Sequence, residues 1–255
     1  MTEWSALSDE LNAWSGIGRE VTLWWRDDDA CRANANLERL LNIASIKQTP
    51  ICLAAVPMAV QPDLRSLLNA GIDISVAVHG ITHENFSESG EKKCELSGNR
   101  STEETVKQLV WGLELLVELA GEKAIPVLVP PWNRIAEAFI PLLPRHGFAG
   151  LSTYGSRRMS NPATRLLQVN CHVDPIDWRN EGKFLGTERA LAMLIKHLKG
   201  RRHGLVDPDE PTGLLTHHAI WSDEAFEFVI QLLTETRQHP SVRWLGAQDV
   251  FGLRA

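Results

Sequence analysis

Apolar runs alternate with helical patterns along most of the chain. Several of the runs are apolar on both faces, which is typical of parallel strands covered by helices. Strands are expected at residues 21–25, 51–56, 72–78, 124–129, 166–173, 213–216 and 242–247, with a weaker one at 149–153. Helices are expected at residues 36–44, 63–71, 101–121, 135–146, 187–199 and 223–238. A strand followed by a helix, repeated seven or eight times, predicts a (β/α) barrel or a doubly wound parallel sheet.

Local signals mark the limits of some elements. Ser101 and Glu104 form the capping box of the long helix, and Gly121 suits its C-cap. Residues 155–165 and 200–212 are rich in Gly, Pro, Ser and charge, so they are expected to be the long loops. Because no low-complexity linker or break in composition divides the chain, residues 1–255 are expected to form one domain.

Polar side chains gather where the predicted strands end. The stretch Trp24–Ala30 reads WWRDDDA and places three adjacent aspartates at the end of a buried strand. Later strand ends carry HGITH (79–83), PPWN (130–133), HVDPIDW (172–178) and THH (216–218). In both candidate folds, ligand-binding and catalytic residues lie at the C-terminal ends of the parallel strands. These strand ends are therefore expected to deliver acids, imidazoles and tryptophans to one face.

The aspartate triplet needs a partner, because adjacent carboxylates repel one another and resist desolvation. An acidic run often caps a following helix, a duty that Asn34 or Asn36 could share. A divalent cation is the simpler partner for Asp27, Asp28 and Asp29, because a single ion offsets the repulsion between the carboxylates. The triplet therefore favours a metal site at the end of the first strand.

Two histidines supply the ligands that such a site would need. His79 and His83 are spaced i and i+4, which suits one metal if the segment turns helically. Alone, the pair is equally well interpreted as a turn histidine and a neighbour of a helix cap. Two imidazoles and one carboxylate leave coordination positions open for water. Trp132 and Trp178, at two other strand ends, could stack on sugar rings or simply pack.

Composition narrows the class of protein. Apolar residues make up 44% and charged residues 23% of the chain, which is ordinary for a soluble globular protein. The net charge of -6, without a strong Lys/Arg cluster, argues against a nucleic-acid partner. Four cysteines without a C-x-x-C pair indicate a reduced chain. With neither a signal peptide nor an apolar run long enough to span a membrane, the protein is expected in the cytoplasm without a membrane partner.

With these residues in this order, the chain from about Val21 to about Phe251 resembles the polysaccharide deacetylase family (NodB-homology, carbohydrate esterase 4) and its divergent cytoplasmic members. The resemblance implies an α/β fold, a distorted TIM-like (β/α) barrel of about seven parallel strands. It also implies a hydrolase that removes N-acetyl groups from amino sugars with a divalent metal. Zinc is the first choice, with cobalt, nickel or manganese as alternatives. The implied partner is a carbohydrate or small-molecule substrate.

The resemblance also implies roles for individual residues. The family's first motif ends in two aspartates, which makes Asp28 the catalytic base and Asp29 a metal ligand. A register shifted by one residue would assign Asp27 and Asp28 instead. His79 and His83 match the family's histidine motif and are implied as metal ligands. The implied substrate-binding residues are Pro131, Trp132, Asn133, Asp177, Trp178 and His218.

The chain departs from the family pattern at two positions. Gly80 stands where the histidine motif carries a hydroxyl residue. Val129 stands where an arginine normally precedes the prolines of the third motif and pairs with the catalytic aspartate. Arg26 or Arg134 could take the place of that arginine.

Three functions are open at the level of sequence. In the first, a metal-dependent deacetylase, Asp28 takes a proton from water, and His217 in the family's L-x-x-H motif protonates the leaving amine. The second keeps the barrel without the metal, as in allantoinase-like relatives that cleave cyclic amides. The third is a non-catalytic carbohydrate-binding protein on a decayed site, suggested by the missing arginine. The sequence predicts no oligomeric state.

Overall fold

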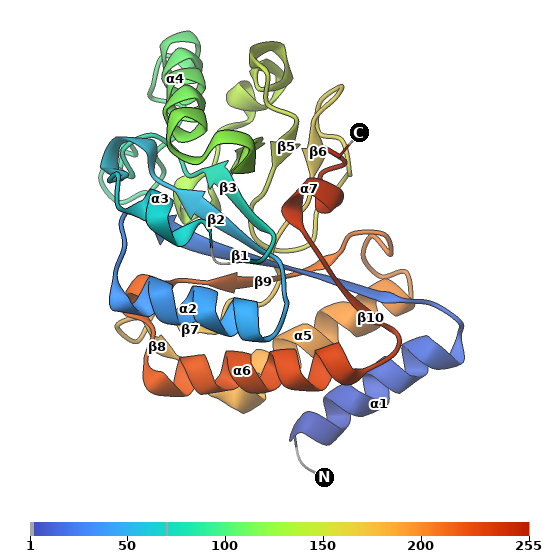
Figure 1. Cartoon of the computed structure of the whole chain (residues 1–255). Coiled ribbons are helices and arrows are strands. Elements are labelled where there is room, and N and C mark those ends of the chain that lie inside the picture. Colours follow the sequence, from blue (N-terminus) through green and yellow to red (C-terminus); the bar gives the residue numbers. More distant parts are fainter. Residues whose placement is uncertain (1–2, 70, 255) are drawn as a thin grey trace.

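The computed structural model describes residues 3–69 and 71–254 (Figure 1). The α-helices in this part of the chain are α1 (Glu3–Gly16), α2 (Ala35–Ile46), α3 (Leu64–Leu67), α4 (Thr102–Ala120), α5 (Thr187–Arg202), α6 (Asp223–Gln238) and α7 (Ala247–Val250). The strands are β1 (Val21–Ala30), β2 (Ile51–Ala55), β3 (Ile74–Val78), β4 (Ala124–Leu128), β5 (Gly150–Leu151), β6 (Leu167–Gln168), β7 (Ile176–Asp177), β8 (Lys183–Phe184), β9 (Thr212–Thr216) and β10 (Val242–Leu245). Short 3₁₀ helices span Pro57–Ala59, Gly121–Lys123, Pro131–Asn133, Glu137–Leu142, Pro144–His146 and His218–Ile220.

The main sheet is built from parallel pairs. Its hydrogen-bonded order is β10-β1-β2-β3-β4-β5-β6, and β9 also pairs with β1. Leu23 and Trp24 of β1 pair with both β9 and β10, whereas Arg26 and Asp27 pair with both β9 and β2. Strands β10 and β2 therefore share one edge of β1, and β9 lies along the other edge.

The segment that follows β6 closes this sheet into a distorted (β/α) barrel. The backbone N–H of His172 donates to Gly213 O at 2.7 Å, and that of Leu215 donates to Val173 O at 2.8 Å, so the segment runs beside β9. Because β9 pairs with β1, the two ends of the sheet are joined. A doubly wound sheet would leave both ends open, so the barrel prediction is confirmed and the alternative is excluded.

Helices cover the outside of the barrel. Figure 1 shows α5 and α6 below β1 and β9, with α1 against α5, and α4 beside β3 and β4. Trp14 of α1, Trp25 of β1 and Phe226 of α6 are buried in the core between these layers. No helix in the described part of the chain has the length and apolar character needed to cross a membrane.

Most predicted elements are present, and a few differ. The helix expected at 135–146 is wrong: two 3₁₀ turns lie there, because Pro141 and Pro144 oppose α-helical hydrogen bonding. The strand expected at 166–173 shortens to β6 followed by isolated bridges. The helix expected at 63–71 shortens to α3, and one residue of that range lies outside the described residues. The antiparallel β7–β8 hairpin does not follow from the sequence pattern.

Replacing Gly213 with alanine tests the closure of the barrel. A Cβ at this position would lie 2.5 Å from Trp24 Nε1 and 2.7 Å from Asn170 O, so β9 would have to move away. We expect ~2 kcal/mol of lost unfolding free energy and a Tm lower by roughly 4–8 °C. Thermal denaturation measures this, with Gly16→Ala as the control because nothing lies within 4 Å of its Cβ position. Equal Tm values for the two variants would contradict the close approach.

Candidate active site and metal centre

The side chains of the three aspartates at the end of β1 point in different directions. Side chains alternate along a strand, so Arg26 and Asp28 share one face and Asp27 takes the other. The register between β1 and β2 shifts between Asp27 and Ala30, and Asp29 has a positive φ of 69°. A bulge of this kind changes the direction of a side chain, so Asp29 does not follow the alternating side-chain pattern of the strand. The three carboxylates accordingly have three different sets of neighbours.

Asp29 lies against the two histidines that follow β3. Its Oδ1 is 3.2 Å from His79 Nε2 and 3.3 Å from His83 Nε2, and the donor atoms of this candidate metal triad lie within 4.8 Å of one another. His79 Nδ1 lies 2.9 Å from the carbonyl oxygen of Val129, which can only accept, so Nδ1 carries the hydrogen. Nε2 is then the ligating nitrogen, oriented by its partner. The triad is a donor set that suits zinc and related divalent metals.

A buried glutamate holds the turn that carries His83. Glu95 accepts the backbone N–H of Ile81 at 3.0 Å and that of His83 at 3.2 Å. Gly80 has a φ of 63°, and a Cβ there would lie 2.1 Å from Glu95 Oε2 and 2.5 Å from Pro131 Cγ. Only glycine fits this position, which accounts for the missing hydroxyl residue in the histidine motif. Sequence analysis did not single out Glu95, because no motif marks it.

Arg26 is the arginine that pairs with Asp28. Its side chain is 0% exposed, and Nε and Nη2 donate to the two oxygens of Asp28 at 2.8 and 3.0 Å. Nη1 also donates to Ser152 Oγ at 2.7 Å, and Nη2 to Asn133 Oδ1 at 2.7 Å. Burial lowers the pKa of Arg26, but the charge of Asp28, its hydrogen bond and the nearby thiols of Cys171 and Cys52 together raise it. Arg134, the other candidate, donates to a backbone carbonyl at the surface instead.

Asp27 points away from the candidate metal triad and contacts His218. Its carboxylate accepts from Thr216 Oγ1 at 2.6 Å and from the backbone N–H of His218 at 3.1 Å, and it also bonds to His218 Nδ1. Burial lowers the pKa of His218, but Asp27 outweighs this and raises it. Asp27 therefore has a full set of partners without a metal.

His217 faces the same cavity as Asp28 and the candidate metal triad. This active-site cavity has a volume of about 630 Å³. The Trp178 ring packs edge-on against the imidazole of His217, with ring centroids 4.8 Å apart. Trp178 Nε1 donates to Asp174 Oδ2 at 2.7 Å, and burial raises the pKa of the Asp174 carboxyl, although His217 and this hydrogen bond oppose the shift. Asp174, rather than Asp177, is therefore the aspartate of the DPIDW stretch that faces the cavity.

The pKa shifts favour the ligating forms of Asp29 and His83, whereas His79 would have to release a proton before it binds a metal. Burial raises the pKa of Asp29, but its hydrogen bond to His79 and the charges of the nearby imidazoles outweigh this and lower it. Burial lowers the pKa of His79, but the carboxylates of Asp28 and Asp29 raise it overall. Burial and the charge of His79 together lower the pKa of His83. At neutral pH, Asp29 is thus an anion and His83 is neutral, as metal binding requires.

The active-site cavity gathers most of the residues singled out in the sequence. Those that line it are Asp28, Asp29, His79, His83, Trp132, Asn133, Trp178 and His217. Three others do not: Pro131 lies buried against Gly80, Asp177 pairs with Arg189 at 3.5 Å, and His218 faces Asp27. Arg134, which the sequence offered only as a partner for Asp28, also lines the cavity, and the lining residues that sequence analysis missed are Lys93, Tyr154, Asp174, Ile176, Leu185 and Met193. Only Asp174 had a signal, its place in the DPIDW stretch.

The fold and the site together define a distorted (β/α) barrel with a candidate metal triad at its strand ends. No family model and no curated protein matches the sequence. Solved structures do match, and this chain has the fold of the polysaccharide deacetylases of carbohydrate esterase family 4, as the resemblance implied.

Three solved structures illustrate the likeness. A Mycobacterium smegmatis protein with a provisional assignment as polysaccharide deacetylase is 17% identical, with 92% of this chain and 90% of that chain covered and a TM-score of 0.66. The peptidoglycan deacetylase PdaC of Bacillus subtilis is 14% identical, with 92% and 91% covered and a TM-score of 0.54. A family 4 acetyl xylan esterase of Clostridium thermocellum, solved with cobalt, is 14% identical, with 91% of each chain covered and a TM-score of 0.53.

Replacing Glu95 with glutamine tests how the histidine turn is held. Glutamine offers one oxygen instead of two, and its NH2 group would face a backbone N–H that now has an acceptor. We expect zinc affinity to fall by about 10–100-fold, which a competition titration with a chromophoric chelator measures. Glu103→Gln, on the exposed face of α4, is the matched control. Unchanged zinc affinity in Glu95→Gln would show that Glu95 does not position the ligands.

Proposed function

We propose that this protein is a metal-dependent hydrolase that removes an acetyl or similar acyl group from the nitrogen of an acylated sugar or related small molecule. The observation that carries the proposal is the candidate metal triad, which shares one cavity with Asp28 and His217. These groups are a ligand set, a base and an acid, which amide hydrolysis requires. Fold likeness to deacetylases and an esterase agrees with this reaction class.

Asp28 is the proposed general base. A divalent cation held by Asp29, His79 and His83 would supply Lewis acidity and make a bound water more acidic. Arg26 holds both oxygens of Asp28, so the carboxylate has one fixed orientation at the edge of the cavity. The remaining lone pairs of Asp28 can accept the proton of the attacking water.

His217 is the proposed general acid. The Trp178 ring packs against the imidazole of His217 and limits its orientation, and Trp178 Nε1 is held in turn by Asp174. A protonated His217 can give its proton to the leaving amine, which is too basic to depart as an anion. Trp178 and Trp132 also line the cavity, and aromatic rings at this position suit contact with a sugar ring.

Zinc is the proposed metal, with cobalt, nickel or manganese as alternatives, because the ligands are two imidazoles and one carboxylate. A metal-free, allantoinase-like reaction is less well supported. Two imidazole nitrogens and one carboxylate oxygen converge as a metal site does, and a metal-free reaction does not require this donor set. The non-catalytic alternative was suggested by the missing arginine at position 129. Arg26 pairs with Asp28 in its place, so that reason for a decayed site no longer applies. The cytoplasmic location expected from the sequence stays a prediction.

Two substitutions separate the roles of neighbouring aspartates. Asp28→Asn is expected to retain zinc and lower kcat by about 10²–10⁴-fold, because the amide cannot accept the proton. Asp29→Asn is expected to lose zinc, since it removes an anionic ligand. Elemental analysis measures the metal, and turnover of N-acetylated sugars and 4-nitrophenyl acetate measures the activity.

Two results of these measurements would contradict the assigned roles or the mechanism. If Asp28→Asn loses zinc while Asp29→Asn keeps it, the register shifted to Asp27 and Asp28 is correct. If the wild-type protein stays fully active after chelation, with no metal left by elemental analysis, the metal-dependent mechanism fails.

A further inference from the structure

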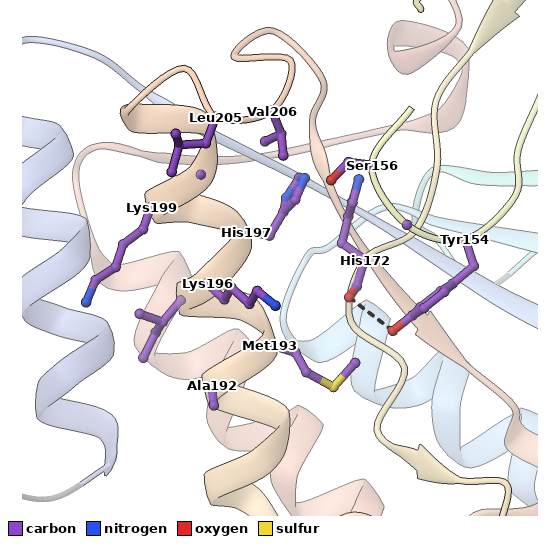
Figure 2. Close-up of a pocket in the computed structure, with 13 residues that line it drawn as sticks. Tyr154, Ser156, His172, Ala192, Met193, Lys196, His197, Lys199, Leu205 and Val206 are labelled. Carbon is purple, nitrogen blue, oxygen red and sulfur yellow. Dashed lines mark hydrogen bonds between the residues drawn. The ribbon is translucent and has the colours of Figure 1, made fainter. Parts of the chain in front are cut away.

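A second cavity, of about 780 Å³, lies along helix α5 (Figure 2). Ala192 and Met193 of α5 form one wall, and the segment from Tyr154 to Ser156 forms the other. Leu205 and Val206 close one end. We call this cavity the α5 groove; its lining is predominantly apolar.

The α5 groove adjoins the active-site cavity, because Tyr154 and Met193 line both. The Tyr154 hydroxyl donates to the backbone carbonyl of His172, two residues before Asp174, at 3.3 Å (Figure 2), and burial together with the charge of Asp174 raises the pKa of Tyr154. Asp174 accepts from Trp178 Nε1, and the Trp178 ring packs against His217, the proposed general acid. The groove therefore meets the active site on the side where the leaving amine receives its proton.

The floor of the α5 groove is uncharged. The rings of His172 and His197 stack with centroids 3.5 Å apart and 18° between their planes. Burial lowers the pKa of both, that of His197 to about 2, so both rings are neutral at pH 7. A ligand in this groove meets two neutral aromatic rings rather than a charge.

The geometry of this pair opposes a metal, although Glu210 brings a third potential ligand atom within 4.8 Å. His172 Nδ1 accepts the backbone N–H of Gly213 at 3.0 Å, so the neutral ring carries its hydrogen on Nε2 and cannot ligate there. Lone pairs lie in the ring planes, and two nearly parallel planes do not converge on one ion. Glu210 already accepts the backbone N–H groups of Arg157 and Asn170.

We propose that the α5 groove binds an apolar substituent on the amine portion of the substrate, such as the alkyl chain of a glycolipid, while the acylated nitrogen lies in the active-site cavity. This inference rests on the proposed function, because the general acid defines the side of the leaving amine. Leu205, which is 80% exposed at the groove, would be covered by such a chain. Lys196 and Lys199 also line the groove, and because both are exposed, their aliphatic stems can contact an alkyl chain while their ammonium groups stay in water.

The methyl and octyl glycosides of N-acetylglucosamine test the groove separately from the chemistry. With the zinc-loaded protein and octyl glycoside below its micelle concentration, kcat/KM is expected to be ~30-fold higher for the octyl compound, because several methylenes leave water. Ala192→Trp fills the groove from α5 and is expected to reduce this ratio to about threefold or less. Its rate on the methyl glycoside should be unchanged. Ile46→Trp, at an exposed position of α2 away from the groove, is the matched control and should keep the full ratio.

Failure of this inference and failure of the proposed function give different results. Equal kcat/KM values for the two glycosides, or an octyl preference that survives Ala192→Trp, would overturn the groove and leave the deacetylase proposal intact. If neither glycoside is hydrolysed, the deacetylase proposal fails for this sugar, and titration calorimetry with the octyl glycoside decides on the groove. Binding that Ala192→Trp abolishes and Ile46→Trp retains supports the groove, and absence of binding overturns it.

Discussion

The buried guanidinium of Arg26 is the interaction on which the mouth of the barrel depends. It donates to Asp28 on its own strand, to Asn133 after β4 and to Ser152 after β5, so one side chain joins three strand ends. A fully buried charge persists only when it is paired and hydrogen-bonded, and removal of one partner costs about 3–5 kcal/mol. The three strand ends are therefore held in one relative position. The carboxylate of Asp28 is held with them, at the cavity where chemistry is proposed.

Backbone strain is concentrated at the same strand ends. Asp29, His83, Trp132 and Asn133 all have a positive φ, of 69°, 61°, 55° and 57°, although none is glycine. Such conformations cost on the order of 1–3 kcal/mol each and persist only when the surroundings fix them. Glu95 fixes the turn of His83, and the buried guanidinium fixes Asn133. These hydrogen bonds hold the strained backbone in place. They do not use the His83 nitrogen that faces Asp29, so the site is pre-organised for a ligand.

Strands that are apolar on both faces predicted a parallel sheet covered by helices, either a barrel or a doubly wound sheet, and the family resemblance then implied the barrel. The polar residues that follow those strands predicted the location of the site. The sequence did not predict the direction of each aspartate, since the triplet looks uniform until the register shift between β1 and β2 is known. The sequence did not predict roles for Glu95 and Asp174, because their contacts depend on how loops fold over the strand ends. The mistaken helix at 135–146 has a local cause, because apolar spacing was given more weight than two prolines.

The triplet shows how one short stretch can separate a metal ligand from a base. Asp27 is compensated by His218, Asp28 by Arg26, and Asp29 by the two histidines of the candidate metal triad. Because each carboxylate has its own positive or hydrogen-bonding partner, the repulsion between neighbours is offset three times over. A metal at Asp29 need not also hold Asp28, since the guanidinium already compensates that charge. Asp28 consequently keeps lone pairs free to accept a proton, and this freedom is what distinguishes a base from a second ligand.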